Sequence, residues 1–149
     1  MSYTDKQKIE IDKMNTSKSQ WLSITRKLSY SVKESKPEAI VDVQADAINY
    51  RQQVVEEVNI YAVKISKLMQ KLKQAEKEKF EFYATSYSVK TSGTEKLRLI
   101  NADLSEIQLF IDEYDHHVNY LRETSKNLDS INYAVKNKIE LANILGGFK

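Results

Sequence analysis

Lysine residues gather in one stretch of this sequence, and aromatic residues follow them directly. Lys64, Lys67 and Lys71 are spaced to lie on one line along an α-helix, and Lys73 with Lys77 forms a second line. Lysines bind phosphate groups and aromatic rings stack on unpaired bases, as is usual in proteins that bind single strands without sequence preference. The pattern predicts nucleic-acid binding by Lys64, Lys67, Lys71, Lys73, Lys77, Lys79, Phe82, Tyr83, Lys90, Lys96 and Arg98.

A second interpretation of the same residues is structural. A lysine-rich face on a long helix is usually exposed to water without a ligand. Phe82 falls on the apolar stripe of its helix, where packing is expected. Hydroxyl groups between Tyr83 and Ser92 would add hydrogen bonds to phosphates under the first interpretation. The residues alone leave both interpretations open.

The charges of the chain are distributed unevenly, although its formal net charge is only +2. Residues 64–98 carry nine basic and four acidic side chains, which gives +5. Residues 99–121 carry five acidic side chains and no Lys or Arg, which gives −5. Such asymmetry indicates a polyanion contact at the first segment and a protein contact at the second. Pairing of the acidic segment with basic residues of the preceding helix is the alternative.

The side chains needed for most catalytic sites are missing from this sequence. The sequence has no Cys, which excludes a thiolate nucleophile, a thiolate metal site and a disulfide. Glu113 and His116 match one half of the Glu-x-x-His pattern of di-iron helical bundles, with His117 adjacent. The apolar stripe places His116 near the opposite helix face, so a water-exposed role is favoured. We expect neither an enzyme nor a cofactor.

Two long helices must position these residues. Apolar residues alternate at spacings of four and three from Val54 to Phe82, interrupted at Lys79, and again from Leu97 to Ala142, interrupted by the polar Ser125 and Asn132. A stripe of this length favours a partner helix, either within the chain or in another copy. The residues expected to form an oligomer interface are Val58, Tyr61, Ile65, Leu68, Leu72, Ile107, Ile111, Tyr114, Val118 and Leu121.

The expected fold is all-α, because the sequence contains only one Pro and three Gly. Residues 1–35 are expected to form a short amphipathic helix capped by Thr4 or Asp5, with Trp21 as its large apolar anchor. Residues 36–149 are expected to form a long antiparallel helical hairpin with a Ser/Thr-rich connection at 84–94.

Three signals mark the expected helix ends. The sequence Ser35-Lys36-Pro37 ends one helix and starts the next, because Pro is tolerated in a first helical turn. Thr94 after Gly93 opens the last helix, and Gly146-Gly147 closes it. The chain starts without an apolar run and contains no segment of about 20 apolar residues, so neither a signal peptide nor a membrane span is expected.

The order of these features resembles the UvsY recombination mediators of phages. The resemblance covers about residues 44–142 and begins with Asn49-Tyr50 and Asn59-Ile60-Tyr61. It continues with the segment KLMQKLKQAEKEKFEFYATSY, a loop with Ser and Gly, and a final helix. That helix contains KLRLINADLSEIQ and VNYLRETSKNLDSINYAVKNKIE. The first forty residues, Trp21 included, have no counterpart in the resemblance.

The resemblance implies a non-enzymatic accessory of DNA recombination and repair in the cytoplasm of the host cell. Members of that family bind single-stranded DNA, assemble into small rings, here expected to be hexameric or heptameric, and help load a RecA-like recombinase. The loading occurs on DNA covered by single-strand-binding protein. The implied binding residues are Lys64, Lys67, Lys71, Lys73, Lys77 and Lys79, with Phe82 and Tyr83.

A different function class explains the same apolar stripes without any nucleic acid. Long heptad-patterned helices also build structural coiled-coil assemblies and protein–protein adaptors. Ring assembly favours the mediator, because several weak basic surfaces on one particle act together and gain avidity. Binding of a single-stranded oligonucleotide distinguishes the two functions.

Overall fold

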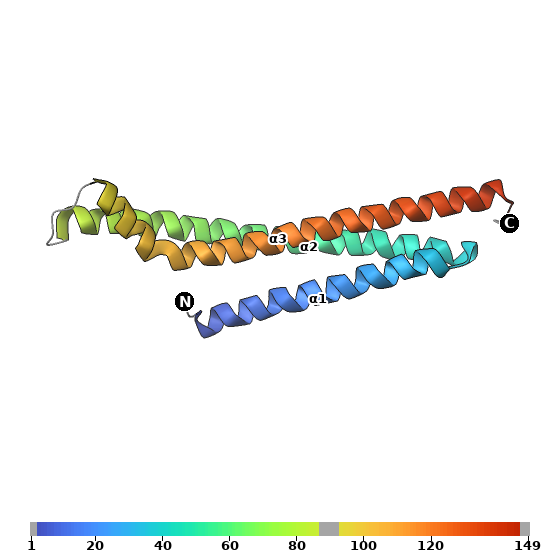
Figure 1. The fold of residues 1–149 in the computed structure, drawn as a ribbon, viewed down its shortest axis with the longest axis horizontal. Coiled ribbons are helices and arrows are strands. Elements are labelled where there is room, and N and C mark those ends of the chain that lie inside the picture. The colour runs from blue at the N-terminus through green and yellow to red at the C-terminus, as the bar shows by residue number, and fades with distance from the viewer. Residues whose placement is uncertain (1–2, 87–92, 147–149) are drawn as a thin grey trace. The chain divides into compact units, whose positions relative to one another are not determined.

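Three helices account for most of the structure, which is a computed structural model describing residues 3–86 and 93–146 (Figure 1). Within the described residues no strand occurs, and the predicted all-α fold is confirmed. The elements in chain order are α1 (Asp5–Glu34), α2 (Pro37–Glu81), the π-helical turn η1 (Phe82–Ser86) and α3 (Gly93–Ile144). Most of the predicted Ser/Thr-rich connection, including Lys90, lies outside the described residues.

The ends of α1 and the start of α2 are where local signals place them. The Thr4 hydroxyl accepts a hydrogen bond from the Gln7 backbone at 3.2 Å, and the Gln7 side chain accepts one from the Thr4 backbone at 2.9 Å. This capping box satisfies two backbone donors that the first helical turn leaves without partners. The helix ends before Ser35 and the next begins at Pro37, as the sequence predicts.

The ends of α3 agree with the prediction to within one residue. The helix begins at Gly93 rather than at Thr94, a difference of the size expected where a first helical turn frays. It ends at Ile144, and Gly146 adopts a φ of 73°. This left-handed conformation favours glycine and is common just after a helix.

The described residues form two compact units. One, which we name the three-helix unit, consists of residues 3–60 and 117–146. It contains α1, the first part of α2 and the second part of α3. The other, the hairpin unit, consists of residues 61–86 and 93–116, and contains the rest of α2, η1 and the start of α3.

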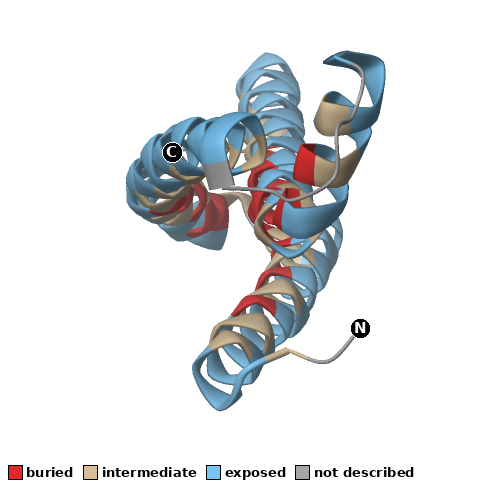
Figure 2. Ribbon diagram, turned by 90° about the vertical axis from the view of Figure 1, so that its left-hand side faces the viewer, coloured by how far each residue is buried: buried red, intermediate tan, exposed pale blue. Residues whose placement is uncertain are grey.

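The core of the three-helix unit is built from residues that recur at every seventh position on each helix. Seven residues make about two helical turns, so each set lies on one stripe. Figure 2 shows buried residues as narrow bands on helices whose remaining surface is largely exposed. The buried sets are Met14, Trp21 and Leu28 on α1, Ile40, Ala47 and Val54 on α2, and Leu121, Leu128 and Val135 on α3.

Polar contacts fix α1 against α3 inside the three-helix unit. The Lys138 ammonium donates hydrogen bonds to the carbonyl oxygens of Val32 at 2.6 Å and Ser35 at 2.7 Å. These carbonyls belong to the carboxyl end of α1, where a cation also interacts favourably with the helix dipole. Near the other end, the Tyr120 hydroxyl donates to the carbonyl oxygen of Lys18 at 3.0 Å. The two helices therefore run in the same direction.

Among its described residues, the hairpin unit has two α-helical segments, which run antiparallel, and the short turn η1. Tyr61 and Tyr114 approach with ring centroids 5.5 Å apart, and Lys79 of α2 lies near Asp103 of α3. With no third helix among the described residues of this unit, some apolar residues between the segments, such as Leu72, are only half-buried, while others, such as Ile100 and Leu104, are buried. Large apolar residues exposed in this unit are Val63, Met69, Phe80, Phe82, Leu97 and Leu109.

The residues predicted to form an oligomer interface pack within one chain. Tyr61, Ile111 and Tyr114 are buried in the hairpin unit, while Val118 and Leu121 are buried in the three-helix unit. The half-buried members are Val58, Ile65, Leu68, Leu72 and Ile107. Pairing of the stripes within the chain therefore accounts for them, and assembly into an oligomer stays a prediction.

Candidate nucleic-acid interface

Four of the predicted lysines form an exposed group on α2 of the hairpin unit. The neighbouring residues Leu68 and Leu72 turn toward α3, which leaves the lysines on the outer side of the helix. None of the four makes an ion pair with any residue that the structure describes. We name this group, Lys67, Lys71, Lys73 and Lys77, the lysine face.

Lys64 and Lys79 contact other side chains of the hairpin unit, which distinguishes them from the lysine face. The Lys64 ammonium lies 5.0 Å from the ring centroid of Tyr61 and 5.9 Å from that of Tyr114. The Lys79 ammonium lies 3.8 Å from an Asp103 oxygen, so the lysine that interrupts the apolar stripe pairs with the opposite helix. Both cations contribute to packing, through cation–π attraction and an ion pair.

The two predicted aromatic residues are also engaged within the hairpin unit. The Phe82 ring lies 5.1 Å from the Tyr83 ring in an edge-on arrangement, and the Lys79 ammonium lies 5.8 Å from the Phe82 centroid. The Tyr83 hydroxyl donates a hydrogen bond to Asp103 at 2.7 Å. Tyr83 therefore ties η1 to α3, and Phe82 packs beside it while remaining 44 % exposed.

Phe80 is an exposed aromatic residue that the predicted set omits. Its side chain is 45 % exposed, and it makes no ring or cation–π contact with the described residues. It follows Lys73 by seven positions and Lys77 by three, so the three residues share one line along α2. This spacing can be read from the sequence, and it would have indicated that Phe80 lies beside the lysines.

The remaining predicted basic residues lie near the start of α3. Arg98 is exposed and Lys96 is half-buried, and neither makes an ion pair within the described part of the chain. Both belong to the hairpin unit, as the lysine face does. The basic character predicted for residues 64–98 is thus retained on the surface of one unit.

The acidic segment of α3 shows the predicted pairing within the hairpin at Asp103, while contact with a protein partner stays a prediction. Asp103 accepts the Tyr83 hydrogen bond and lies beside Lys79, which is the predicted pairing within the hairpin. Glu106 and Asp115 are exposed to solvent on the same helix. Exposed carboxylates are suited to contact a basic protein partner. These two residues therefore stay candidates for the predicted protein contact.

A buried polar cluster centred on Glu57 joins the three helices of the three-helix unit. The Glu57 carboxylate accepts hydrogen bonds from the Ser17 hydroxyl at 2.6 Å and the Trp21 indole at 3.4 Å. Its Oε2 atom lies 3.0 Å from Nε2 of His117, whose side chain is 0 % exposed. From the sequence alone, His117 is only a neighbour of His116. Its contact with Glu57 could not be predicted, because the two residues lie 60 positions apart.

The pKa of the Glu57 carboxyl reflects two opposing effects. Burial alone raises this pKa, because removal from water disfavours the charged carboxylate. Hydrogen bonds from His117, Ser17 and Trp21, with the charge of His117, more than offset burial and hold the pKa below its usual value of 4.5. The cluster therefore favours an ionised Glu57 in the folded protein.

Trp21 has the core role predicted for it, and its ring also meets Tyr50. Trp21 is 6 % exposed, and its ring centroid lies 6.0 Å from that of Tyr50 in an edge-on arrangement. Because the indole N–H also bonds Glu57, the residue combines apolar burial with a satisfied donor. Trp21 therefore anchors α1 in the core.

No metal site is formed by the residues that the structure describes. No group of three His, Cys, Asp or Glu side chains there is arranged to hold a metal ion. His116, half of the di-iron-like pattern with Glu113, is exposed. Among the described helices, none combines the length and apolar character needed to cross a membrane.

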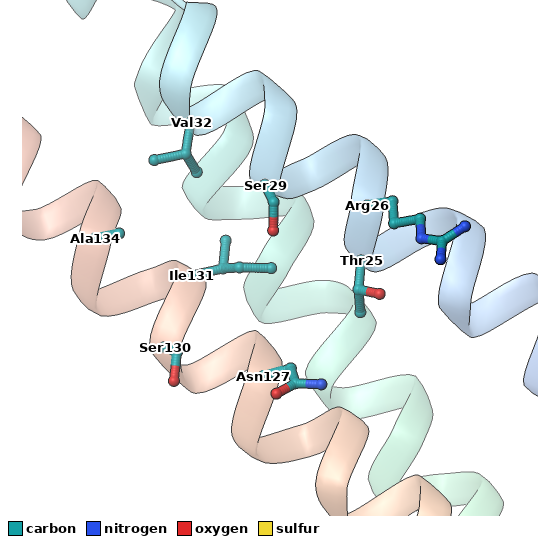
Figure 3. A pocket seen from close by; sticks show the side chains of 8 residues that line it. All are labelled: Thr25, Arg26, Ser29, Val32, Asn127, Ser130, Ile131 and Ala134. Atoms are coloured by element: carbon teal, nitrogen blue, oxygen red, sulfur yellow. The ribbon is translucent and has the colours of Figure 1, made fainter.

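A groove of the three-helix unit lies between α1 and α3 and has a volume of about 540 Å³. Ile131 projects from α3 toward α1 between the two helices (Figure 3). Small and polar side chains line the rest, and no cluster of charges selects a ligand. The lining residues are Thr25, Arg26, Ser29 and Val32 of α1, and Asn127, Ser130, Ile131 and Ala134 of α3.

Comparisons with protein-family models, curated proteins and solved structures gave no match to this chain. The chain's own residues are therefore the basis for inferring its function. The lysine face, with Phe80 beside it, is the surface feature that best indicates a ligand.

Proposed function

We propose that this protein is a single-stranded DNA-binding recombination mediator. In this role it helps load a RecA-like recombinase onto DNA coated by single-strand-binding protein. The observation that carries the proposal is the lysine face, four exposed lysines on one helix without an ion pair in the described residues. The proposal also accounts for the basic character of Arg98 and Lys96 in the same unit.

The spacing of the lysine face supports a polyanionic ligand. Lys67 and Lys71 are four residues apart, and so are Lys73 and Lys77. Like charges at this spacing repel and destabilise a helix by roughly 0.2–0.5 kcal/mol for each pair. Binding of phosphates removes that repulsion and releases the counterions condensed on the nucleic acid. A helix that keeps two such pairs unneutralised is therefore well suited to a phosphate backbone.

Assembly and partner contacts complete the proposed mechanism. Exposed apolar residues of the hairpin unit, including Val63, Met69 and Leu109, offer area for contacts between copies. A ring of copies would present several lysine faces to one strand and bind it more tightly than a single chain. The exposed carboxylates of Glu106 and Asp115 would receive a basic surface of the recombinase or of single-strand-binding protein.

Binding of a fluorescent single-stranded oligonucleotide across a salt series tests the proposal. Replacing Lys67, Lys71 and Lys77 by Ala should weaken binding without loss of helix content. The slope of log K against log salt concentration should flatten by about 0.7 for each lysine removed. A matched control replaces Lys6, Lys8 and Lys27, three exposed lysines of the three-helix unit, and should leave binding nearly unchanged.

Failure of the wild-type protein to bind the oligonucleotide at low salt would contradict the proposal. Equal effects of the two triple replacements would assign binding to net charge rather than to the lysine face. The mediator role itself is tested by strand exchange with a recombinase on DNA already coated by single-strand-binding protein. The protein should stimulate that reaction, and the lysine-face variant should not.

A structural assembly or protein–protein adaptor without nucleic-acid binding is the second candidate function. The exposed apolar side chains of the hairpin unit favour it, because they offer contacts to other protein chains. Under this function, the lysine-face variant would change solubility alone. Sedimentation of that variant and of a Met69→Asp variant distinguishes an assembly role from a DNA-binding role.

A further inference from the structure

We infer that Phe80 is the residue on which a base of the bound strand stacks, and that the strand follows the line of Lys73, Lys77 and Phe80. The inference rests on the proposed function and deepens it. It names the side chain that gives the lysine face its preference for single-stranded over duplex DNA.

The geometry of α2 places Phe80 at the end of a basic line. Lys73, Lys77 and Phe80 occupy positions i, i+4 and i+7, which lie one above another on a helix surface. All three side chains are exposed. A strand whose phosphates contact the two ammonium groups would therefore bring the next base toward the Phe80 ring. Lysines followed by an exposed ring are the elements from which single-strand grooves are built.

The alternative line along α2 is less favourable for a polyanion. Lys67 and Lys71 are continued on the same line by Gln74 and Glu78. The Gln74 amide donates a hydrogen bond to the Glu78 carboxylate at 3.2 Å, which keeps a negative charge on that line. The carboxylate would repel a phosphate seven positions after Lys71, and the position that corresponds to Phe80, seven after Lys67, is Gln74 rather than an aromatic residue.

The acidic groups near the Phe80 line differ in direction: Glu81, four positions after Lys77, is exposed, whereas Glu76 is turned away. Glu76 lies between Lys73 and Phe80 in sequence, but it is half-buried and lines a groove with Leu72 and Asp112 on the side of α3. The phosphate path over Lys73 and Lys77 therefore avoids this carboxylate.

The other rings near the lysine face are already occupied by protein contacts. Phe82 is packed against Tyr83 and lies near Lys79. Tyr83 is held by its hydrogen bond to Asp103. Stacking of a base on either ring would require these contacts to rearrange. Phe80 requires no such rearrangement, because its exposed ring has no aromatic or cationic partner among the described residues.

The test compares Phe80→Ala with wild type on three oligonucleotides of equal length. They are a thymidine single strand, an abasic single strand with the same phosphates, and a duplex. We expect Phe80→Ala to weaken binding of the thymidine strand by roughly tenfold, within the range measured for one stacked base. Binding of the abasic strand and of the duplex should change less than twofold, because neither offers an unstacked base.

Two sets of variants control this test. Phe80→Trp should retain or strengthen binding of the thymidine strand, because an indole offers a larger stacking face. Tyr133→Ala removes an exposed aromatic residue from the three-helix unit and should have no effect. Replacing Lys73 and Lys77 by Ala should weaken binding more than replacing Lys67 and Lys71, although both changes remove two charges.

The outcomes separate failure of the inference from failure of the proposed function. If wild type binds the thymidine strand and Phe80→Ala binds it equally well, the inference is wrong and the proposed function stands. The same holds if Phe80→Ala weakens binding of the abasic strand as much as binding of the thymidine strand. The ring would then contribute to binding without stacking on a base. If wild type binds none of the three oligonucleotides, the proposed function fails and takes the inference with it.

Discussion

The three-helix unit and the hairpin unit are made from the same two long helices, yet their surfaces differ. In the three-helix unit, α1 covers the other helices, and Leu121 and Leu128 are fully buried. In the hairpin unit no third segment is present among the described residues, and the corresponding stripe residue Leu72 is only half-buried. The comparison teaches that the three-helix unit provides most of the apolar burial, while the hairpin unit leaves part of its apolar stripe only half-buried.

The ionisable side chains of the two units differ in the same way. In the three-helix unit, the half-buried Glu57 carboxylate meets the buried His117 ring, and partial removal from water makes an unpaired carboxylate there costly. In the hairpin unit, the lysine face carries four cations that have no ion pair within the described residues. The Glu57 carboxylate is thus engaged within the fold, while the cations of the lysine face are exposed to solvent.

The largest expected effect is on stability, and it should separate the two units. Leu128→Ala removes a fully buried side chain from the three-helix unit and should lower the free energy of unfolding by about 2–5 kcal/mol. Leu72→Ala removes the same atoms from a half-buried site in the hairpin unit and should cost about 1 kcal/mol. Urea unfolding followed by circular dichroism measures both. Equal losses would contradict the division of burial between the units.

The buried polar cluster should show the next largest effect. Glu57→Gln removes the charge that faces His117 and should lower the free energy of unfolding by about 1–3 kcal/mol. The neighbouring Glu56 is exposed and makes no ion pair with the described residues, so Glu56→Gln is a matched control. It should change stability by less than about 0.5 kcal/mol. A similar loss in both variants would show that the cluster does not hold α1 in place.

The pH dependence of stability tests the ionised state of Glu57. Its pKa in the folded protein lies below the usual value of 4.5, so its ionised form stabilises the folded state above pH 4.5. This contribution should disappear as the pH falls below 4.5 and passes through the folded-state pKa. The stability difference between wild type and Glu57→Gln should therefore shrink on acidification, as measured by urea unfolding at several pH values. A difference that stays constant would mean that the charge of Glu57 contributes nothing.

Features set by neighbours in the sequence could be predicted, whereas those set by pairing between distant segments could not. The cap at Thr4, the helix start at Pro37 and the helix end before Gly146 depend on local backbone chemistry, and the sequence identified them. The contact between Glu57 and His117 depends on the register of α2 against α3, which no local signal specifies.

The candidate site divides in the same way. The spacing of the lysines showed that they lie on lines along a helix, which is a local property. It did not show that Lys79 is paired with Asp103, because that contact crosses from α2 to α3. Phe82 falls on the apolar stripe and packs against the adjacent Tyr83, as the sequence indicates, whereas Phe80, which the predicted set omits, has no ring contact with the described residues.

The smallest expected effect concerns exposed ion pairs, one in each unit. In the hairpin unit, Lys79 and Asp103 are 43 % and 35 % exposed, and in the three-helix unit, Arg51 and Asp129 are 46 % and 53 % exposed. A double-mutant cycle with Ala at each pair should give a coupling of about 0.2–1 kcal/mol in both units, and salt should reduce it. Similar values would show that exposure, rather than the number of packed helices, sets the strength of a pair. A coupling well above this range for Lys79 and Asp103 alone would instead mean that this pair is a structural tie of the hairpin. Lys79 would then be unable to join the lysine face in binding phosphate.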